Sequence, residues 1–127
     1  MAKVMVVDDA VSELKLMESI LRSAGHQVSC YPGGEQLEQR IADERPDVLL
    51  LDIVMPNRNG YDVLRGVRKD PRTKDTPVVF VSSKNQESDQ VWGKRQGAAD
   101  YLPKPFTAEQ LLTMVRQFVP APPGRPA

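Results

Sequence analysis

Near the middle of the chain stands the stretch Pro46-Asp47-Val48-Leu49-Leu50-Leu51-Asp52-Ile53-Val54-Met55-Pro56. The apolar run 48–51 is too short for a membrane span and is typical of a strand buried on both faces, as in a parallel sheet. The run ends in Asp52, and helix-type spacing of apolar residues begins at Gly60. Asp52 is therefore predicted at the carboxyl end of a central strand, where open α/β sheets bind ligands. Taken alone, it could equally cap the next turn.

Length and composition indicate one domain with balanced charge. The chain has 127 residues, with 17 Lys plus Arg and 17 Asp plus Glu. No basic excess favours nucleic acid, and no helix-turn-helix follows the domain. We expect a domain over 1–119 and a disordered, Pro-rich tail over 120–127. The amino terminus shows neither a signal peptide nor a membrane-inserted helix, so we expect a cytoplasmic protein.

Two single residues carry simpler expectations. Cys30 has no second cysteine to pair with, and we expect it to be a small buried residue of a strand. His26 is the only histidine and follows Gly25 at an expected helix end, so we expect it in a solvent-exposed turn rather than in a metal or phosphohistidine site.

Strand-type and helix-type patterns alternate along the rest of the chain. Short runs rich in β-branched residues predict further strands over 3–7, 27–31, 77–81 and 100–102. Apolar residues three or four apart predict helices over 10–24, 35–44, 85–96 and 107–119, and one more after Gly60. The apolar face expected for the first helix consists of Val11, Leu14, Met17 and Leu21.

Two local signals refine the later helices. Gly93 lies inside the expected fourth helix, where glycine costs about 1 kcal/mol relative to alanine. We expect it to mark a close packing contact. Thr107 followed by Gln110 is typical of a capping box at the start of the last helix.

Alternating strands and helices predict an α/β domain with a parallel sheet. Right-handed crossovers bring the carboxyl ends of all its strands to one edge. The polar residues expected there are Asp8, Asp9, Asp52, Ser82, Ser83 and Lys104. A structural role can explain any one of them, but their common position at strand ends indicates a functional site.

These residue types favour phosphoryl chemistry. Clustered carboxylates repel one another unless they share a cation, and their oxygens suit Mg²⁺. A cation, the Lys104 ammonium and the Ser82 hydroxyl can together stabilise a phosphoryl group during transfer. A carboxylate can accept that group covalently, and Asp52 is the central one.

The sequence resembles the receiver domains of two-component response regulators, a CheY-like family. The matching motifs are Asp8-Asp9, Asp52-Ile53-Val54-Met55-Pro56 with Gly60, Ser82 after an apolar strand, Gly97-Ala98, and Tyr101 with Lys104-Pro105-Phe106. The resemblance covers residues 3–119. It implies a flavodoxin-like, doubly wound sheet of five parallel strands in the order 2-1-3-4-5 with five helices.

The resemblance also implies the reaction and its metal. Asp52 would accept a phosphoryl group from a CheA-type histidine kinase and later release it by self-catalysed hydrolysis. Asp9 would bind Mg²⁺ directly and Asp8 through water. Asp52 itself and the backbone carbonyl of Val54 would complete the metal set. The chain would be a phosphoacceptor switch rather than an enzyme acting on other substrates.

By the same resemblance, Ser82 and Lys104 would bind the phosphoryl oxygens. A cis peptide bond before Pro105 would aim Lys104 inward. When Ser82 moves toward the phosphoryl group, Tyr101 could turn inward and alter the face formed by the fourth helix, fifth strand and fifth helix. The alternative for Tyr101 is an ordinary aromatic residue at a sheet edge.

A finer resemblance lies in the run 83–98. It is similar to single-domain regulators of the chemosensory systems that control type IV pili, which implies a downstream motility or pilus protein as partner. We expect a monomer, although nothing in the sequence fixes the oligomeric state. Val54 is apolar where many members carry a polar group, and Lys84 adds charge near the phosphoryl site. Both predict slow autodephosphorylation.

Two other classes of function compete with the switch. A receiver-fold interaction module independent of phosphorylation usually lacks an acid, the hydroxyl or the lysine, and here all are present. An aspartyl phosphatase would resemble a different arrangement, with two acids separated by one residue after the first strand. In this chain Asp8 and Asp9 are adjacent, and the central acid follows a later strand.

Overall fold

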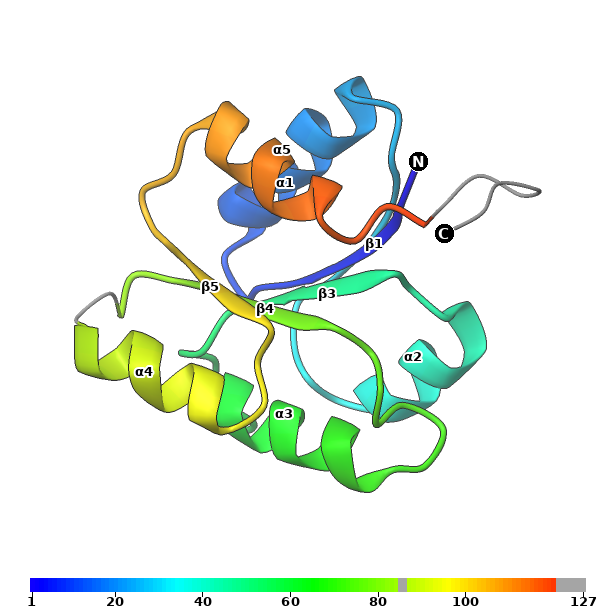
Figure 1. The fold of residues 1–127 in the computed structure, drawn as a ribbon, viewed down its shortest axis with the longest axis vertical. Helices are drawn as coiled ribbons and strands as arrows, with labels where there is room; N and C mark the ends of the chain where they lie inside the picture. The colour runs from blue at the N-terminus through cyan, green and yellow to red at the C-terminus, as the bar shows by residue number, and fades with distance from the viewer. Residues whose placement is uncertain (85–86, 121–127) are drawn as a thin grey trace.

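Strands and helices alternate along the chain (Figure 1). This computed structural model describes residues 1–84 and 87–120. The elements are β1 (Lys3–Val7), α1 (Val11–Ser23), β2 (Gln27–Tyr31), α2 (Leu37–Glu44), β3 (Val48–Leu51), α3 (Gly60–Lys69), β4 (Val78–Ser82), α4 (Glu87–Arg95), β5 (Asp100–Pro103) and α5 (Ala108–Arg116). The predicted alternation is confirmed. The expected first turn of the fourth helix, at 85–86, and residues 121–127 of the expected tail lie outside the described residues.

The sheet has the predicted order and direction. Its strands run β2-β1-β3-β4-β5, and each neighbouring pair is parallel. β3 lies at the centre, and all four of its residues are fully buried. Because β1 and β4 pair with β3 on either side, the residues that follow β1 and β3 and the end of β4 meet at one edge of the sheet.

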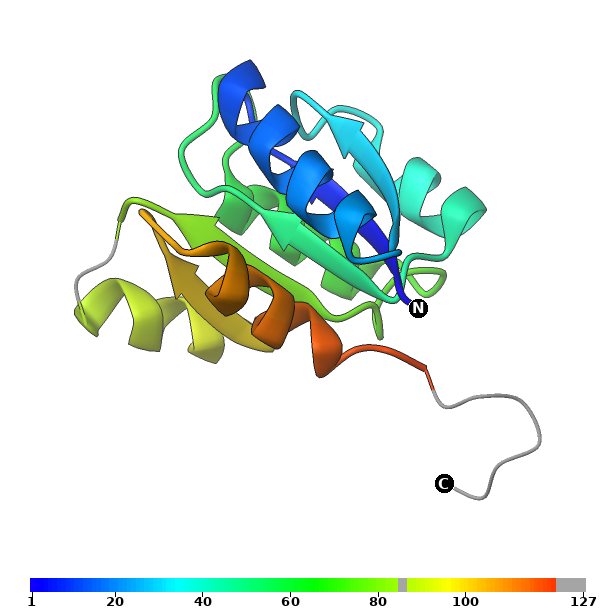
Figure 2. The ribbon, with the colours of Figure 1, turned by 90° about the horizontal axis from the view of Figure 1, so that it is seen from above.

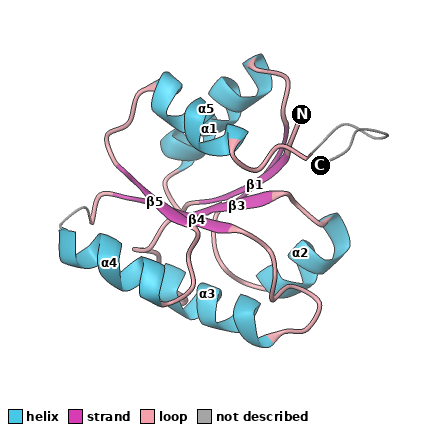
Figure 3. Cartoon of the chain, viewed as in Figure 1, coloured by secondary structure: helices cyan, strands magenta, loops and turns pink. Residues whose placement is uncertain are grey.

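Helices cover both faces of the sheet, with α1 and α5 on one side and α2, α3 and α4 on the other (Figures 1 and 2). Figure 3 shows the same three layers by secondary structure. Each face has its own apolar cluster. Val79 and Val81 of β4 pack in the cluster that contains residues of α1 and α5, while Phe80 packs in the opposite cluster with residues of α2 and α3. This alternation follows from the period of two in a strand.

Val11 is not part of the buried face of α1. Leu14, Met17 and Leu21 are buried, but Val11 is 58% exposed. It is the first residue of a helix that begins at the carboxyl edge of the sheet, beyond the last residues of β1. Helical spacing therefore predicted the correct face but not where the underlying sheet ends.

His26 is buried rather than solvent-exposed, so that expectation was wrong. Its side chain is 7% exposed, and its Nδ1 accepts a hydrogen bond from the backbone N–H of Ala2 at 3.1 Å. The residue lies just before β2, beside the start of β1, where the parallel pairing of the two strands brings the chain segments together.

Cys30 is half-buried rather than buried as expected, because β2 is an edge strand, and it lies at the margin of the cluster that contains residues of α1 and α5. Burial and the nearby Glu18 carboxylate raise the pKa of its thiol to about 11. A thiol with so high a pKa is poorly reactive at neutral pH, as expected for a structural cysteine.

The two helix signals are confirmed. A Cβ added at Gly93 would lie 3.0 Å from the ring of Phe80, so α4 packs closely on the sheet at this point. Thr107 and Gln110 form the predicted capping box at the start of α5. Among residues 1–84 and 87–120, no helix is long and apolar enough to cross a membrane. The cytoplasmic location stays a prediction.

Candidate functional site at the carboxyl edge of the sheet

A cleft of about 560 Å³ opens at the carboxyl edge of the sheet. Its lining residues come from the segments after β1, β3, β4 and β5 and from the first turns of α1: Asp8, Asp9, Ala10, Glu13, Leu16, Asp52, Val54, Ser83, Lys104, Pro105 and Phe106. Most of the polar residues predicted to meet at this edge therefore do so. Ser82 lies fully buried at the end of β4, next to Ser83.

Three carboxylates form the acidic centre of the cleft. Asp8, Asp9 and Asp52 each offer an oxygen, and these oxygens lie within 4.8 Å of one another. Asp8 and Asp52 are buried, whereas Asp9 is exposed. Carboxylate oxygens at this spacing, with one member open to solvent, fit a hard cation that keeps part of its water shell, such as Mg²⁺.

Asp8 is the most buried of the three acids, and the ammonium group of Lys104 balances its negative charge. Its Oδ2 pairs with Nζ of Lys104 at 2.6 Å, and its Oδ1 accepts the Ala10 backbone N–H at 2.9 Å. The peptide bond between Lys104 and Pro105 is cis, as predicted. Lys104 points into the cleft with only 13% of its side chain exposed, which meets the requirement that a buried carboxylate have a charged partner.

Asp52 stands one residue after β3 and has a raised pKa. Burial is the main cause, and the Asp8 carboxylate adds to it. The Lys104 ammonium, the Ile53 backbone N–H at 2.8 Å and the Ser82 hydroxyl lower the pKa of Asp52 and offset part of that rise. The net effect is a poorly hydrated carboxylate whose negative charge is only partly balanced by nearby donors. Carboxylates in this state are more typical of reacting groups than of structural ones.

Ser82 and Tyr101 lie on the side of the sheet that α3 and α4 cover. Tyr101 is 4% exposed, and its ring lies 6.1 Å from that of Phe80. Burial raises the pKa of Tyr101 to about 12, while the nearby Ser82 hydroxyl lowers it. The Tyr101 hydroxyl has no hydrogen-bond partner within the described part of the chain. In this structure the tyrosine ring therefore already lies inside the protein.

The two residues expected to slow dephosphorylation occupy different positions. Val54 is 60% exposed and lines the cleft. Lys84 lies outside the cleft lining, with its Nζ 3.9 Å from a carboxylate oxygen of Asp89 in α4. Its backbone N–H donates to the Ser82 hydroxyl oxygen at 3.3 Å.

The sequence did not single out Glu13 and Leu16, which line the cleft from the first turns of α1. Glu13 stands four residues after Asp9, and that spacing near a helix start could have placed it at the same edge. Leu16 lies off the apolar face that the spacing picked out, so no pattern marked it.

The sequence matches the response regulator receiver domain family over residues 4–116. This match covers most of the chain, and the chain belongs to that family. Receiver domains are phosphoacceptor switches, and they generally bind Mg²⁺ at an acidic pocket of the kind that Asp8, Asp9 and Asp52 form here.

Among individual relatives, protein PilH of Pseudomonas aeruginosa is 44% identical over 115 residues, which span 91% of this chain and 95% of PilH. Solved structures agree. The Vibrio cholerae chemotaxis protein CheY4 superposes with a TM-score of 0.85 at 30% identity, covering 94% of this chain and 99% of CheY4. A Francisella response regulator receiver domain superposes with a TM-score of 0.85 at 26% identity, covering 93% of this chain and 96% of that domain.

Proposed function

We propose that this chain is a stand-alone response regulator that accepts a phosphoryl group on Asp52 from a CheA-type histidine kinase. The observation that carries the proposal is the convergence of three carboxylates with Ser82 and Lys104 at one edge of the sheet. Family membership supports it, because the residues that meet there are those that the receiver motif requires.

In the proposed transfer, a carboxylate oxygen of Asp52 attacks the phosphorus of the kinase phosphohistidine. The new O–P bond forms as the P–N bond breaks, and the imidazole nitrogen takes up a proton. Lys104 and the Ser82 hydroxyl bind the equatorial phosphoryl oxygens, where charge accumulates in the transition state. Hydrolysis by water then restores the Asp52 carboxylate and releases inorganic phosphate.

Asp8, Asp9, Asp52 and the backbone carbonyl of Val54 would hold Mg²⁺. When bound, the ion supplies positive charge that neutralises the phosphoryl oxygens and the crowded carboxylates. The Lys104 ammonium has three N–H donors, so it can bind a phosphoryl oxygen while it keeps its ion pair with Asp8.

The proposed switch links the cleft to α4. Ser82 moves toward the phosphoryl group and leaves space beside β4, which stabilises the inward position of Tyr101. Holding the ring inward fixes its packing against Phe80, which itself contacts Gly93 of α4, and with it the surface formed by α4, β5 and α5. Phosphorylation would shift the population of that surface toward the form that binds the next protein.

We place this switch in the control of motility. The 44% identity to PilH over nearly the full length of both chains supports a pilus chemosensory system, with a downstream motility or pilus protein as the partner. The exposed Val54 offers no polar group to orient an attacking water. We expect slow autodephosphorylation. A phosphoryl lifetime as short as that of fast chemotaxis regulators would contradict it.

The deciding experiment is phosphorylation by acetyl phosphate, followed by intact-protein mass spectrometry. With Mg²⁺, the chain should gain the mass of one phosphoryl group. A chelator should abolish the gain, as should Asp52→Ala. The control variant is Asp43→Ala, which removes an exposed aspartate of α2 and should leave the adduct unchanged. If the folded wild-type chain forms no adduct, the protein is an interaction module that works without phosphorylation.

A further inference from the structure

The loop that follows Asp52 spans residues 53–59, and backbone contacts fix its two ends. The Gly60 N–H donates to the Ile53 carbonyl at 2.8 Å, and a Cβ added at Gly60 would lie 2.4 Å from the Asp52 carbonyl oxygen. Between these ends, the Arg58 N–H donates to the Pro56 carbonyl at 2.8 Å, which closes a tight turn. Val54 of this loop lines the same cleft as Asp8, Asp9 and Asp52.

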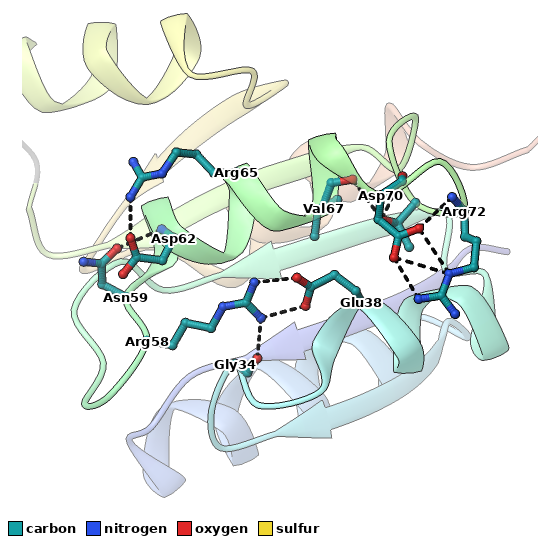
Figure 4. Close-up of polar contacts among 10 residues, drawn as sticks. Gly34, Glu38, Arg58, Asn59, Asp62, Arg65, Val67, Asp70 and Arg72 are labelled. Carbon is teal, nitrogen blue, oxygen red and sulfur yellow. Dashed lines mark hydrogen bonds and ion pairs between the residues drawn. The ribbon is translucent and has the colours of Figure 1, made fainter.

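Arg58 connects this loop to the start of α2. Its Nη1 and Nη2 each donate to one Glu38 carboxylate oxygen at 2.6 Å, and Nη1 also donates to the Gly34 carbonyl at 2.8 Å (Figure 4). The two side chains are only 26% and 24% exposed. A bidentate, partly buried pair of this kind is stronger and more directional than a surface ion pair.

Two glycines leave room for the pair. A Cβ added at Gly66 of α3 would lie 2.2 Å from a Glu38 carboxylate oxygen and 2.3 Å from Nη2 of Arg58. A Cβ added at Gly34 would lie 2.6 Å from Val63 of α3 and 3.4 Å from Cδ of Arg58. The ion pair thus sits between α2, α3 and the loop, in a space that larger residues would close.

Charge supports the same contact. Hydrogen bonding to Arg58 is the largest influence on Glu38 and lowers the pKa of that carboxyl, while Glu38 raises the pKa of Arg58. Both groups are therefore held in their charged forms, and a bound guanidinium restrains the turn at 56–58 from one side.

We propose that Arg58 is a positioning residue for the metal site. Through Glu38 and Gly34 it holds the loop 53–59 so that the Val54 carbonyl faces the acidic centre, and it thereby sets the affinity for Mg²⁺ without touching the reacting groups. The inference rests on the proposed phosphoacceptor function for its role in signalling. Its effect on Mg²⁺ binding can be measured independently.

The test compares Arg58→Met with the wild-type chain by isothermal titration with Mg²⁺ alone. Methionine keeps the unbranched stem but removes all five donors. We expect the Mg²⁺ dissociation constant to rise roughly tenfold, as is usual when a group that orients a metal ligand is lost. The backbone amides of residues 53–55 should exchange hydrogen faster, and the phosphorylation rate should recover at high Mg²⁺.

Arg65→Met is the matched control. Arg65 pairs with Asp62 on the exposed face of α3, so its loss changes net charge equally without touching the loop (Figure 4). It should leave Mg²⁺ affinity unchanged. An equal effect of both variants would mean that net charge alone is responsible and would overturn the proposal, as would an unchanged Mg²⁺ affinity in folded Arg58→Met.

Glu38→Gln and the double variant complete the design. Glu38→Gln should weaken Mg²⁺ binding in the same direction, and combining it with Arg58→Met should add nothing further, because both changes remove one contact. Fully additive effects would contradict the proposal. If Arg58→Met does not fold, Glu38→Gln and Arg58→Lys carry the test. If the wild type accepts no phosphoryl group, the proposed function fails, while the Mg²⁺ titrations still decide the role of Arg58.

Discussion

His26 holds the start of β1 through a hydrogen bond that only its neutral form can accept. Burial, the positive amino terminus and Arg116 lower the pKa of His26 from its ordinary value of 6.5. A lowered pKa means that the folded state binds the proton less tightly than the unfolded state. The stabilisation is therefore complete above pH 6.5 and is lost as the pH falls through the lowered pKa.

Urea unfolding at a series of pH values between about 5 and about 8 tests this expectation. The wild-type chain should lose about 1 kcal/mol more than His26→Gln over that range, because the variant keeps a neutral acceptor at the same place. Carboxylate titration affects both proteins equally and cancels in the comparison. Identical pH profiles would show that the Ala2 contact contributes nothing.

For the candidate site, the local sequence was enough to predict which residues form the acidic cluster, but not every contact that supports it. Asp8, Asp9 and Asp52 could be placed together because each follows a buried apolar run and parallel strands end at one edge. The pairing of Arg58 with Glu38 could not, since twenty residues separate them and nothing in the sequence distinguishes them from the other charged residues. Their partnership depends on the shape of the space beside Gly66.

At the scale of elements, the junction between β3 and α3 is set by backbone contact. Gly60→Ala should destabilise the protein by about 2 kcal/mol, because the new Cβ would meet the Asp52 carbonyl oxygen and the backbone cannot yield cheaply. Gly33→Ala is the matched control, since a Cβ there meets nothing within 4 Å. It should change stability by less than about 0.5 kcal/mol. If Gly60→Ala and Gly33→Ala unfolded at the same urea concentration, the proposed backbone clash at Gly60 would be refuted.

The elements themselves were predictable to different depths. β3 and β4 are recognisable in the sequence as apolar runs that only a sheet covered on both faces can bury. In α4 Val91 and Trp92 are 44% and 50% exposed, and Gly93 is the residue that packs on the sheet. Hydrophobic spacing could not reveal that orientation, because the contact is made where a side chain is absent; the isolated glycine itself was the signal that predicted the contact.

Taken as a whole, the molecule concentrates negative charge where its stability suffers from it. Asp52 has a raised pKa because burial and Asp8 disfavour its charge. In chelator, Asp52→Asn should therefore be at least as stable as the wild type. Mg²⁺ at about one hundred times its dissociation constant should stabilise the wild type by about 2.7 kcal/mol and the variant by less. Thermal or urea unfolding with and without Mg²⁺ measures both. A wild type that does not respond would argue against a metal site.

The two faces of the sheet should also tolerate amino-acid substitution to different degrees. Phe80, Tyr101 and Ser82 belong to the side covered by α3 and α4, so a disturbance at the cleft reaches that layer by direct contact. α1 and α5 pack on the other side against Val79 and Val81. Exchange of the interior residues of α1 for others of equal volume should therefore leave the signalling layer intact across a lineage, whereas α5 also contributes to the proposed output surface.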